Sequence, residues 1–278
     1  MSILSAIFLG LIQGIAEFLP ISSSGHLSIL QNLFNMQTAE EGHMFFDVLL
    51  HLGTLISVCI VYWADIRDMV VEFFRMISAR GKTGAAAAEN IPVRRQILMI
   101  IITTLPLVLI PPINDYIEQL YYHTVFIGIA LILTGGILYV SDRIIAGHKK
   151  AGSITVKDAL LIGLCQAVTT IPGLSRSGTT IAAGLVFGLD REYAVKYSFL
   201  ISLPAILGAN ILSIGKAIKA GVDVSLLPAY FIGMVVAAAA GVLAIKLVNK
   251  LVKKGSFGKF SYYCWGAGAL AIILSIVL

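Results

Sequence analysis

The chain alternates between long apolar stretches and short polar connections. Six stretches contain no Asp, Glu, Lys or Arg. Their lengths are close to the length of about 20 apolar residues that a helix needs to cross a bilayer. These stretches are Val48–Ala64, Gln96–Asn114, Thr124–Ser141, Tyr197–Gly215, Val224–Ile245 and Phe260–Leu278. We therefore predict six transmembrane helices, each of which extends a few residues past its apolar stretch.

Two other apolar stretches are interrupted in the middle by polar residues. The first covers residues 3–34 and is broken at Pro20–His26, and the second covers residues 159–189 and is broken at Pro172–Gly178. Each half is roughly a dozen to seventeen residues long, which is too short to cross a bilayer alone. We therefore predict two re-entrant helical hairpins, at about 3–34 and 158–190, each of which enters and leaves the membrane by the same face.

The positive charges indicate which loops face the cytoplasm. With six crossings and two hairpins, one set of loops carries 16 Lys and Arg residues, whereas the opposite set carries two, Lys216 and Lys219. The first set comprises loops 65–95, 142–158, 189–193 and 246–259, and the second comprises loops 35–43, 115–123 and 216–223. Because cytoplasmic loops are enriched in Lys and Arg, we expect the first set inside and the second set, with both termini, outside.

The two halves of the chain resemble each other after a shift of 153 residues. The shift aligns residues 10–13 with residues 163–166, and it aligns Ser22, Ser24 and Gly25 with Ser175, Ser177 and Gly178. We divide the single membrane domain into repeats 1–150 and 151–278, each a hairpin followed by three crossings. Since three is odd, the second repeat is inverted relative to the first, and in such folds broken helices form the site near the midplane.

Composition favours an all-α polytopic membrane protein and excludes a soluble domain. Hydrophobic residues make up 58% of the chain and charged residues 13%, compared with about 45–50% and about 25% in soluble domains. The net charge of +5 follows from the basic loops, so we expect membrane lipids and no nucleic acid as partners. The three cysteines lack paired spacing, which argues against disulfides and a structural zinc site.

Five ionisable residues fall at membrane depth on this topology: Glu17, His26, Asp47, His51 and Arg176. A charge at this depth costs about 2.5–3.5 kcal/mol on insertion scales, so each residue is a candidate for a functional role. For Asp47 and His51, an ordinary packing pair is an equally good interpretation.

The two breaks share the chemistry of an anion site. Serine is favoured as an N-cap, and a helix N-terminus offers unpaired N–H groups and a partial positive charge. Inversion brings two such N-termini toward one point, where Arg176 adds a planar fork that fits phosphate. The pattern therefore predicts a phosphate or diphosphate pocket at Ser22, Ser24, Gly25, Ser175, Ser177 and Gly178. Capping of two ordinary loops is the alternative, and it leaves Arg176 unexplained.

Residues beside the first break also indicate catalysis. Gln13, Glu17 and His26 lie close in sequence to three serine hydroxyls, and a base next to a hydroxyl is what an activated nucleophile requires. These residue types suit phosphoryl transfer, with Arg176 and the helix ends stabilising negative charge. The sequence has no Walker-type glycine loop, so it does not indicate a nucleotide cofactor.

Two motifs resemble those of a known family. Residues 13–26, QGIAEFLPISSSGH, resemble the (E/Q)xxxE signature of the undecaprenyl-diphosphate phosphatase family of the bacitracin-resistance type. Residues 172–180, PGLSRSGTT, resemble the PGxSRSGxxT signature of the same family, and the likeness covers essentially the whole chain. The resemblance implies a multi-pass enzyme of the bacterial inner membrane. It would hydrolyse undecaprenyl diphosphate to undecaprenyl phosphate and inorganic phosphate, which recycles the lipid carrier for the cell wall and confers bacitracin resistance.

The resemblance also implies roles for individual residues. Glu17, Ser23, His26 and Arg176 would be catalytic, and Mg²⁺ or Ca²⁺ would bind at Glu17 and Gln13. Substrate contacts would come from Gln13, Ser22, Ser24, Gly25, Ser175, Ser177, Gly178, Thr179 and Thr180. Many members of the family have Glu where this chain has Gln13. Because an amide binds a cation weakly and cannot act as a base, Glu17 is the expected base.

Several alternatives stay open at this point. Attack by Ser23 with help from Glu17, attack by His26, and attack by metal-activated water are three candidate mechanisms. A lipid-phosphate transporter, or flippase, is the alternative function, because inverted repeats with broken helices also build carriers. The first hairpin carries most of the catalytic groups, so we expect the site to open outward. The sequence is compatible with a homodimer but does not determine the oligomeric state.

Overall fold

The structure is a computed structural model that describes residues 2–33, 40–78, 91–220, 223–253 and 257–277. Within these residues the regular elements are helices, apart from one isolated bridge between Lys149 and Leu189. The first half holds α1 (Ile3–Phe18), α2 (Ser23–Leu33), α3 (Glu40–Val61), α4 (Trp63–Ile77), α6 (Ile91–Thr104), the 3-10 helices η2 (Leu105–Leu109) and η3 (Pro111–Ile113), α7 (Asn114–Leu120) and α8 (Thr124–Ser141). The second half holds α9 (Val156–Val168), α10 (Arg176–Val186), α11 (Arg191–Ala220), η4 (Val224–Leu226), α12 (Leu227–Lys253) and α13 (Lys259–Val277).

Long apolar helices confirm a multi-pass membrane protein. Within the described residues, five helical segments are long and apolar enough to cross a membrane, namely Ile91–Leu120, Thr124–Ser141, Arg191–Gly215, Val224–Val252 and Lys259–Val277. The α3 helix adds a sixth candidate when it is counted together with α4, to which it is joined at a bend of 89°. These segments cover the six predicted crossings, so the chain is an all-α polytopic membrane protein.

Two regions differ from the prediction. Part of the predicted loop 65–95 is the amphipathic helix α4, whose Glu72 accepts a hydrogen bond from Nε of Arg94 in α6 at 2.5 Å. Residues 79–90 of that loop lie outside the described residues. The predicted crossing 96–114 is not one regular α-helix, since α6 gives way to η2 and η3. The reason is the prolines at 106, 111 and 112, because proline lacks the N–H that an α-helix requires.

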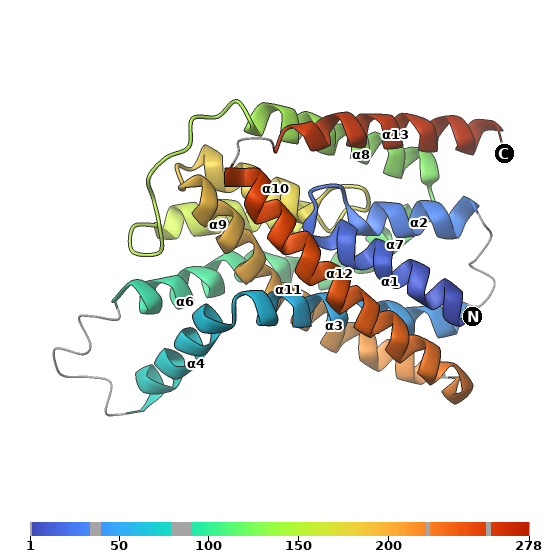
Figure 1. The fold of residues 1–278 in the computed structure, drawn as a ribbon, viewed down its shortest axis with the longest axis horizontal. Helices are drawn as coiled ribbons and strands as arrows, with labels where there is room; N and C mark the ends of the chain where they lie inside the picture. The colour runs from blue at the N-terminus through green and yellow to red at the C-terminus, as the bar shows by residue number, and fades with distance from the viewer. Residues whose placement is uncertain (1, 34–39, 79–90, 221–222, 254–256, 278) are drawn as a thin grey trace.

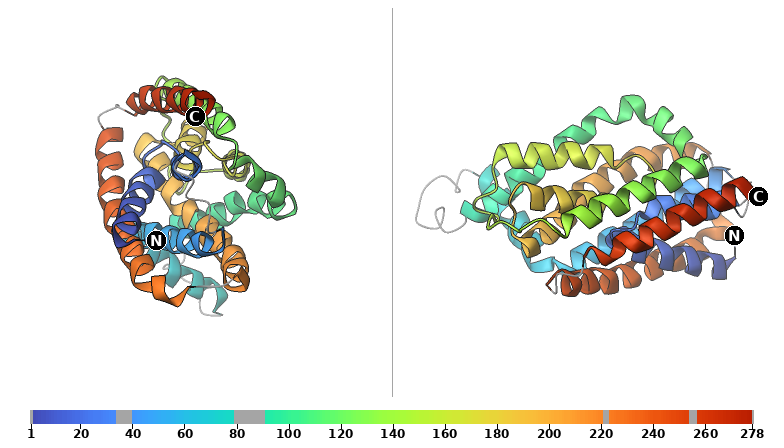
Figure 2. Two further views of the ribbon diagram at one scale, coloured as in Figure 1. Left: turned by 90° about the vertical axis from the view of Figure 1, so that its right-hand side faces the viewer. Right: turned by 90° about the horizontal axis from the view of Figure 1, so that it is seen from above.

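The long helices lie roughly along the longest axis of the molecule, and both termini lie at the same end (Figure 1). The α1 helix packs on α12, α12 packs on α3, and α8 packs on α13, an arrangement that can be followed in Figure 2. Small residues permit these approaches, since a Cβ on Gly14 of α1 would lie 2.4 Å from the carbonyl oxygen of Ala237 in α12. Membrane helices associate through such close packing because lipid provides no hydrophobic driving force between them.

The short helices form two pairs that point toward each other. The α1 helix starts at the end where the termini lie and runs toward the middle, and α2 returns toward that end (Figure 1). The α9 and α10 helices follow the same course from the opposite end. As a result, the break between α1 and α2 and the break between α9 and α10 meet in the middle of the molecule.

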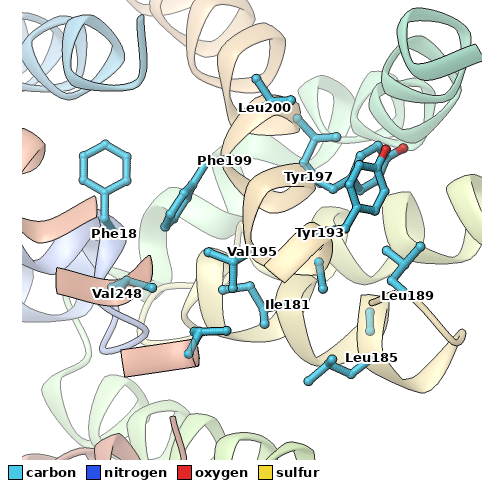
Figure 3. Packing of buried hydrophobic residues seen from close by; sticks show 14 of the residues in the cluster. Phe18, Ile181, Leu185, Leu189, Tyr193, Val195, Tyr197, Phe199, Leu200 and Val248 are labelled. Atoms are coloured by element: carbon cyan, nitrogen blue, oxygen red, sulfur yellow. The ribbon is translucent and has the colours of Figure 1, made fainter. Parts of the chain in front are cut away.

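A shared apolar core holds these two pairs in place. Phe18 at the end of α1 packs edge-on against Phe199 of α11, with ring centroids 5.4 Å apart (Figure 3). Ile181 and Leu185 of α10 belong to the same buried cluster. Because one core fixes both the end of α1 and one face of α10, the relative position of the two breaks is set by packing.

Candidate active site

The break between α1 and α2 is built around Ser22. This residue has a positive φ of 67°, which is uncommon for a residue other than glycine and costs energy that the surrounding structure must supply. The Oγ of Ser22 accepts a hydrogen bond from the N–H of Gly25 at 3.3 Å, and its carbonyl oxygen accepts one from the N–H of His26 at 3.2 Å. The first of these bonds satisfies an N–H group at the start of α2 that has no partner within the helix. The second is the first regular backbone bond of α2.

The break between α9 and α10 repeats these bonds at Ser175. The Oγ of Ser175 accepts from the N–H of Gly178 at 3.1 Å, and its carbonyl oxygen accepts from the N–H of Thr179 at 2.9 Å. Each bond is the counterpart of a bond in the first break after the shift of 153 residues. Serines thus cap the second half-helix at both breaks, which both the predicted anion pocket and the alternative of two ordinary loops require.

The two breaks are in contact. The Oγ of Ser177 donates to the carbonyl oxygen of Leu19 at 3.4 Å. A Cβ on Gly25 would lie 3.0 Å from the Cα of Gly173. Segments far apart in the sequence therefore pack backbone to backbone, and glycine makes this approach sterically acceptable.

Glu17 lies at this junction and accepts hydrogen bonds from three side chains. Its Oε1 accepts from Nη2 of Arg176 at 2.5 Å. Its Oε2 accepts from the Oγ of Ser23 at 2.7 Å and from Nε2 of Gln13 at 2.9 Å. The side chains of Glu17 and Arg176 are only 7% and 17% exposed. The carboxylate and the guanidinium therefore neutralise each other in the interior, where an unpaired charge would be costly.

Three polar atoms in this part of the molecule are buried without a hydrogen-bond partner: Oε1 of Gln13, Nη1 of Arg176 and Oγ1 of Thr179. Leaving a buried donor or acceptor unpaired costs about 1–3 kcal/mol, and more for a charged group. Arg176 thus binds Glu17 with one nitrogen and leaves the other available. A phosphate oxygen, like a carboxylate oxygen, forms strong charge-assisted hydrogen bonds with a guanidinium.

His26 is held by its backbone neighbour and by a distant helix. Its Nδ1 lies 2.7 Å from the carbonyl oxygen of Ser22, and its Nε2 lies 2.8 Å from the hydroxyl of Tyr263 in α13. A carbonyl oxygen can only accept, so Nδ1 carries the proton, and the Nε2 of a neutral ring accepts from Tyr263. The hydrogen bonds of His26 therefore fix the turn at Ser22 and do not reach Glu17.

Of the other predicted residues, Ser24 makes its contact within a break, whereas Thr180 bonds to a different helix. Ser24 lies at the first break with its Oγ 3.4 Å from that of Ser22, whereas Thr180 bonds to the Oγ of Ser198 in α11 at 2.6 Å. Thr180 therefore anchors α10 to its neighbour. Nδ1 of His51 lies 2.8 Å from the carbonyl oxygen of Asp47.

Residues from distant helices hold the breaks, and no pattern in the sequence marks these residues. The Oγ1 of Thr134 in α8 donates to the carbonyl oxygen of Gly173 at 3.0 Å and accepts from the N–H of Ser175 at 3.1 Å. Tyr263 binds His26, as described above. Both residues sit in apolar helices where neither spacing nor residue type marks a functional position.

Glu17 and Gln13 are the residues that fit a divalent cation. Within the described part of the chain, no group of three or more His, Cys, Asp or Glu side chains could enclose a metal ion. Mg²⁺, however, usually binds through one or two carboxylates together with substrate phosphates. The unpartnered Oε1 of Gln13, beside the Glu17 carboxylate, suits a cation that is shared with a substrate.

Fold and site together define a polytopic membrane protein with a buried charged junction between two broken helices, in which a guanidinium, a carboxylate and a hydroxyl meet. Comparison with known families specifies the class further. The family described as "Bacitracin resistance protein BacA" matches residues 6–270, and the chain belongs to this family.

Full-length relatives carry a common name. The chain is 40% identical to proteins named undecaprenyl-diphosphatase from Methanosphaera stadtmanae and from Desulforapulum autotrophicum, with 100% of each chain covered. It is also 40% identical to a protein of the same name from Methanobrevibacter smithii, with 99% of each chain covered.

Proposed function

We propose that this protein hydrolyses undecaprenyl diphosphate to undecaprenyl phosphate and inorganic phosphate within the membrane. This reaction would recycle the lipid carrier of cell-wall synthesis and confer resistance to bacitracin. The observation that carries the proposal is the buried junction itself. Arg176 binds Glu17 with Nη2 and leaves Nη1 without a partner, while the Ser23 hydroxyl donates to the same carboxylate. The name of the relatives, undecaprenyl-diphosphatase, supports the same activity.

Ser23 is the proposed nucleophile. Its Oγ forms a bond to the terminal phosphorus as the bond from that phosphorus to the bridging oxygen breaks, and its proton passes to Oε2 of Glu17, 2.7 Å away. Glu17 gives this proton to the departing lipid phosphate. Water then attacks the phosphoserine, and Glu17 transfers a proton from that water to the Ser23 oxygen as inorganic phosphate leaves.

Arg176 and the two helix N-termini are the proposed stabilisers of charge on the transferred group. Nη1 of Arg176 and the N–H groups in the first turns of α2 and α10 that the serine caps do not engage would face the growing negative charge, where preorganised donors are most effective. A divalent cation at Glu17 and Gln13 would supply further neutralisation of the diphosphate.

The hydrogen bonds of His26 support a positioning role for this residue. Both of its ring nitrogens are engaged, with Ser22 and with Tyr263. The Ser23 hydroxyl, in contrast, already contacts a base. The geometry therefore favours Ser23 over His26 as the nucleophile, and attack by metal-activated water is the remaining rival.

We further propose that the two helix pairs are re-entrant hairpins from opposite leaflets and that residues 1–150 and 151–278 are inverted repeats. The matching bonds at Ser22 and Ser175 and the opposed directions of the pairs support this arrangement. The excess of Lys and Arg on the opposite loops supports a location of both termini outside the plasma membrane. The catalytic groups carried by the first helix pair support a site that opens outward. A homodimer stays a prediction.

Phosphate release by the purified protein tests the function. Wild-type protein should release inorganic phosphate from undecaprenyl diphosphate, Ser23→Ala should not, and a quenched reaction should contain phosphate on Ser23. Phosphohistidine, or labelled water found in the phosphate without any phosphoenzyme, would contradict the serine mechanism. Transfer of the lipid across vesicles without phosphate release would instead support a transporter.

A further inference from the structure

A nearly apolar groove lies beside the junction, on the side of α10 that faces α8 and α9. Its volume is about 750 Å³, and side chains from α8, α9, α10 and α13 line it. Val140 of α8 and Val186 of α10, both in the lining, are 60% and 59% exposed. Such residues would face hydrocarbon in a bilayer, so the groove is accessible to a lipid chain from the side.

One polar residue of the lining adjoins the proposed active site. Thr179 lines the groove, and its Oγ1 is buried without a partner. Thr179 follows Arg176 by three residues on α10, a spacing that places side chains next to each other on a helix. From Thr179 the lining continues along α10 to Val186 and Phe187, away from the junction.

The core and the groove occupy different faces of α10. Ile181 and Leu185 point into the core that α10 shares with α11 (Figure 3). Ala182 and Val186, one residue further on in each case, line the groove. A single helix thus connects the charged junction at its N-terminus with an apolar groove along its side.

We propose that this groove binds the isoprenoid chain of the lipid diphosphate, beginning with the units next to the phosphates. The inference rests on the proposed function, and it adds a binding site for the isoprenoid chain of the substrate. When the diphosphate headgroup is bound in the buried polar site, the attached chain needs an apolar path out of it. The groove begins next to that site and provides such a path. The Thr179 hydroxyl would donate to a diphosphate oxygen at this boundary. An acyl chain of an ordinary membrane lipid is the competing occupant.

Gly136 of α8 provides a direct test because it lines the groove and has open space around it. A Cβ added at Gly136 would meet nothing within 4 Å, and the same is true at Gly208 of α11, which does not line the groove. Gly136→Leu therefore fills the groove without disturbing the packing, and Gly208→Leu is a matched control that makes the same chemical change elsewhere.

The assay compares two substrates that share a headgroup. Undecaprenyl diphosphate carries a long chain, whereas dimethylallyl diphosphate carries a single isoprene unit. We expect Gly136→Leu to raise KM for the long substrate roughly tenfold, as filling an apolar pocket commonly does. It should leave kcat/KM for the short substrate within about twofold of wild type, as should Gly208→Leu for both substrates. Equal effects on both substrates, or no effect on either, would overturn the proposal.

Fluorescence gives a second test that does not depend on turnover. The chain has two tryptophans, Trp63 and Trp265, and Trp265 lines the groove. In a Trp63→Phe background, a nitroxide-labelled polyprenyl phosphate should quench Trp265, and unlabelled polyprenyl phosphate should reverse the quenching whereas phosphatidylglycerol should not. Equal reversal by phosphatidylglycerol would show a non-specific lipid groove. If wild-type protein releases no phosphate but the specific quenching persists, the proposed function fails while the groove assignment stands.

Discussion

Replacing Arg176 by lysine separates the charge of this residue from its forked geometry. Nη2 of Arg176 is occupied by Glu17 at 2.5 Å, and Nη1 is the nitrogen left for substrate. A lysine ammonium keeps the positive charge beside Glu17 but cannot also occupy the second position of the planar fork. Loss of one donor to a developing negative charge costs about 2.7–4 kcal/mol, or roughly 10²–10³ in rate. We expect kcat/KM of Arg176→Lys to fall by this factor.

Phosphate release from undecaprenyl diphosphate in detergent measures the effect, and thermal unfolding reports stability in the same samples. Arg143→Lys is the matched control, because Arg143 is exposed and its guanidinium lies 3.5 Å above the ring of Tyr139, outside the junction. It should keep wild-type activity. Arg176→Ala, which leaves the buried Glu17 carboxylate unpaired, should in addition destabilise the protein by about 3–5 kcal/mol.

Two results would refute this reasoning. If Arg176→Lys retains kcat/KM within about threefold of wild type, the second nitrogen of the fork does not bind the transferred group, since loss of a transition-state donor costs far more. If Arg176→Ala is as stable as wild type, Glu17 is not charged in the interior and the ion pair does not hold the two breaks together.

Three further predictions concern other parts of the molecule. Ser23→Ala should reduce phosphate release at least about 10³-fold while substrate binding, measured by displacement of a labelled lipid phosphate, is retained; residual activity near the wild-type level would exclude Ser23 as nucleophile. Tyr263→Phe removes the bond to His26, 2.8 Å long, and should lower kcat by about 2–12-fold; unchanged kcat would show that this bond does not position the turn. Burial would raise the pKa of Asp158, but the bond from Lys149 at 2.8 Å and the helix-capping bonds outweigh burial and lower it. The stability that Asp158 provides is therefore complete above pH about 4 and is lost as the pH falls through the lowered pKa. Asp158→Asn should cost about 1 kcal/mol at pH 7 and less at pH 3, measured by thermal unfolding, and an equal loss at both values would contradict the assigned charge.

Much of the candidate site could be predicted, because the type of each residue and its immediate sequence neighbours are enough to mark it. A carboxylate and a guanidinium in otherwise apolar segments are costly unless they have a function, which marked Glu17 and Arg176. Serines and glycines at a break mark a helix start, which marked Ser22 and Ser175. The residues that position these groups from other helices, such as Thr134, could not be predicted, because a threonine in an apolar helix has the same local pattern whatever it contacts.

The sequence by itself determined the class of the protein, the six apolar crossings and the two breaks, because the hydrocarbon core of a bilayer admits only apolar segments of sufficient length. It also determined the internal similarity, which reappears as equivalent hydrogen bonds at Ser22 and Ser175. Only the tertiary structure decided that Arg176 binds Glu17 and that His26 forms a hydrogen bond with Tyr263. It also decided that an apolar groove begins at Thr179. The physical reason is that hydropathy and capping act over a few neighbouring residues, whereas these contacts depend on how helices from both halves of the chain pack against one another.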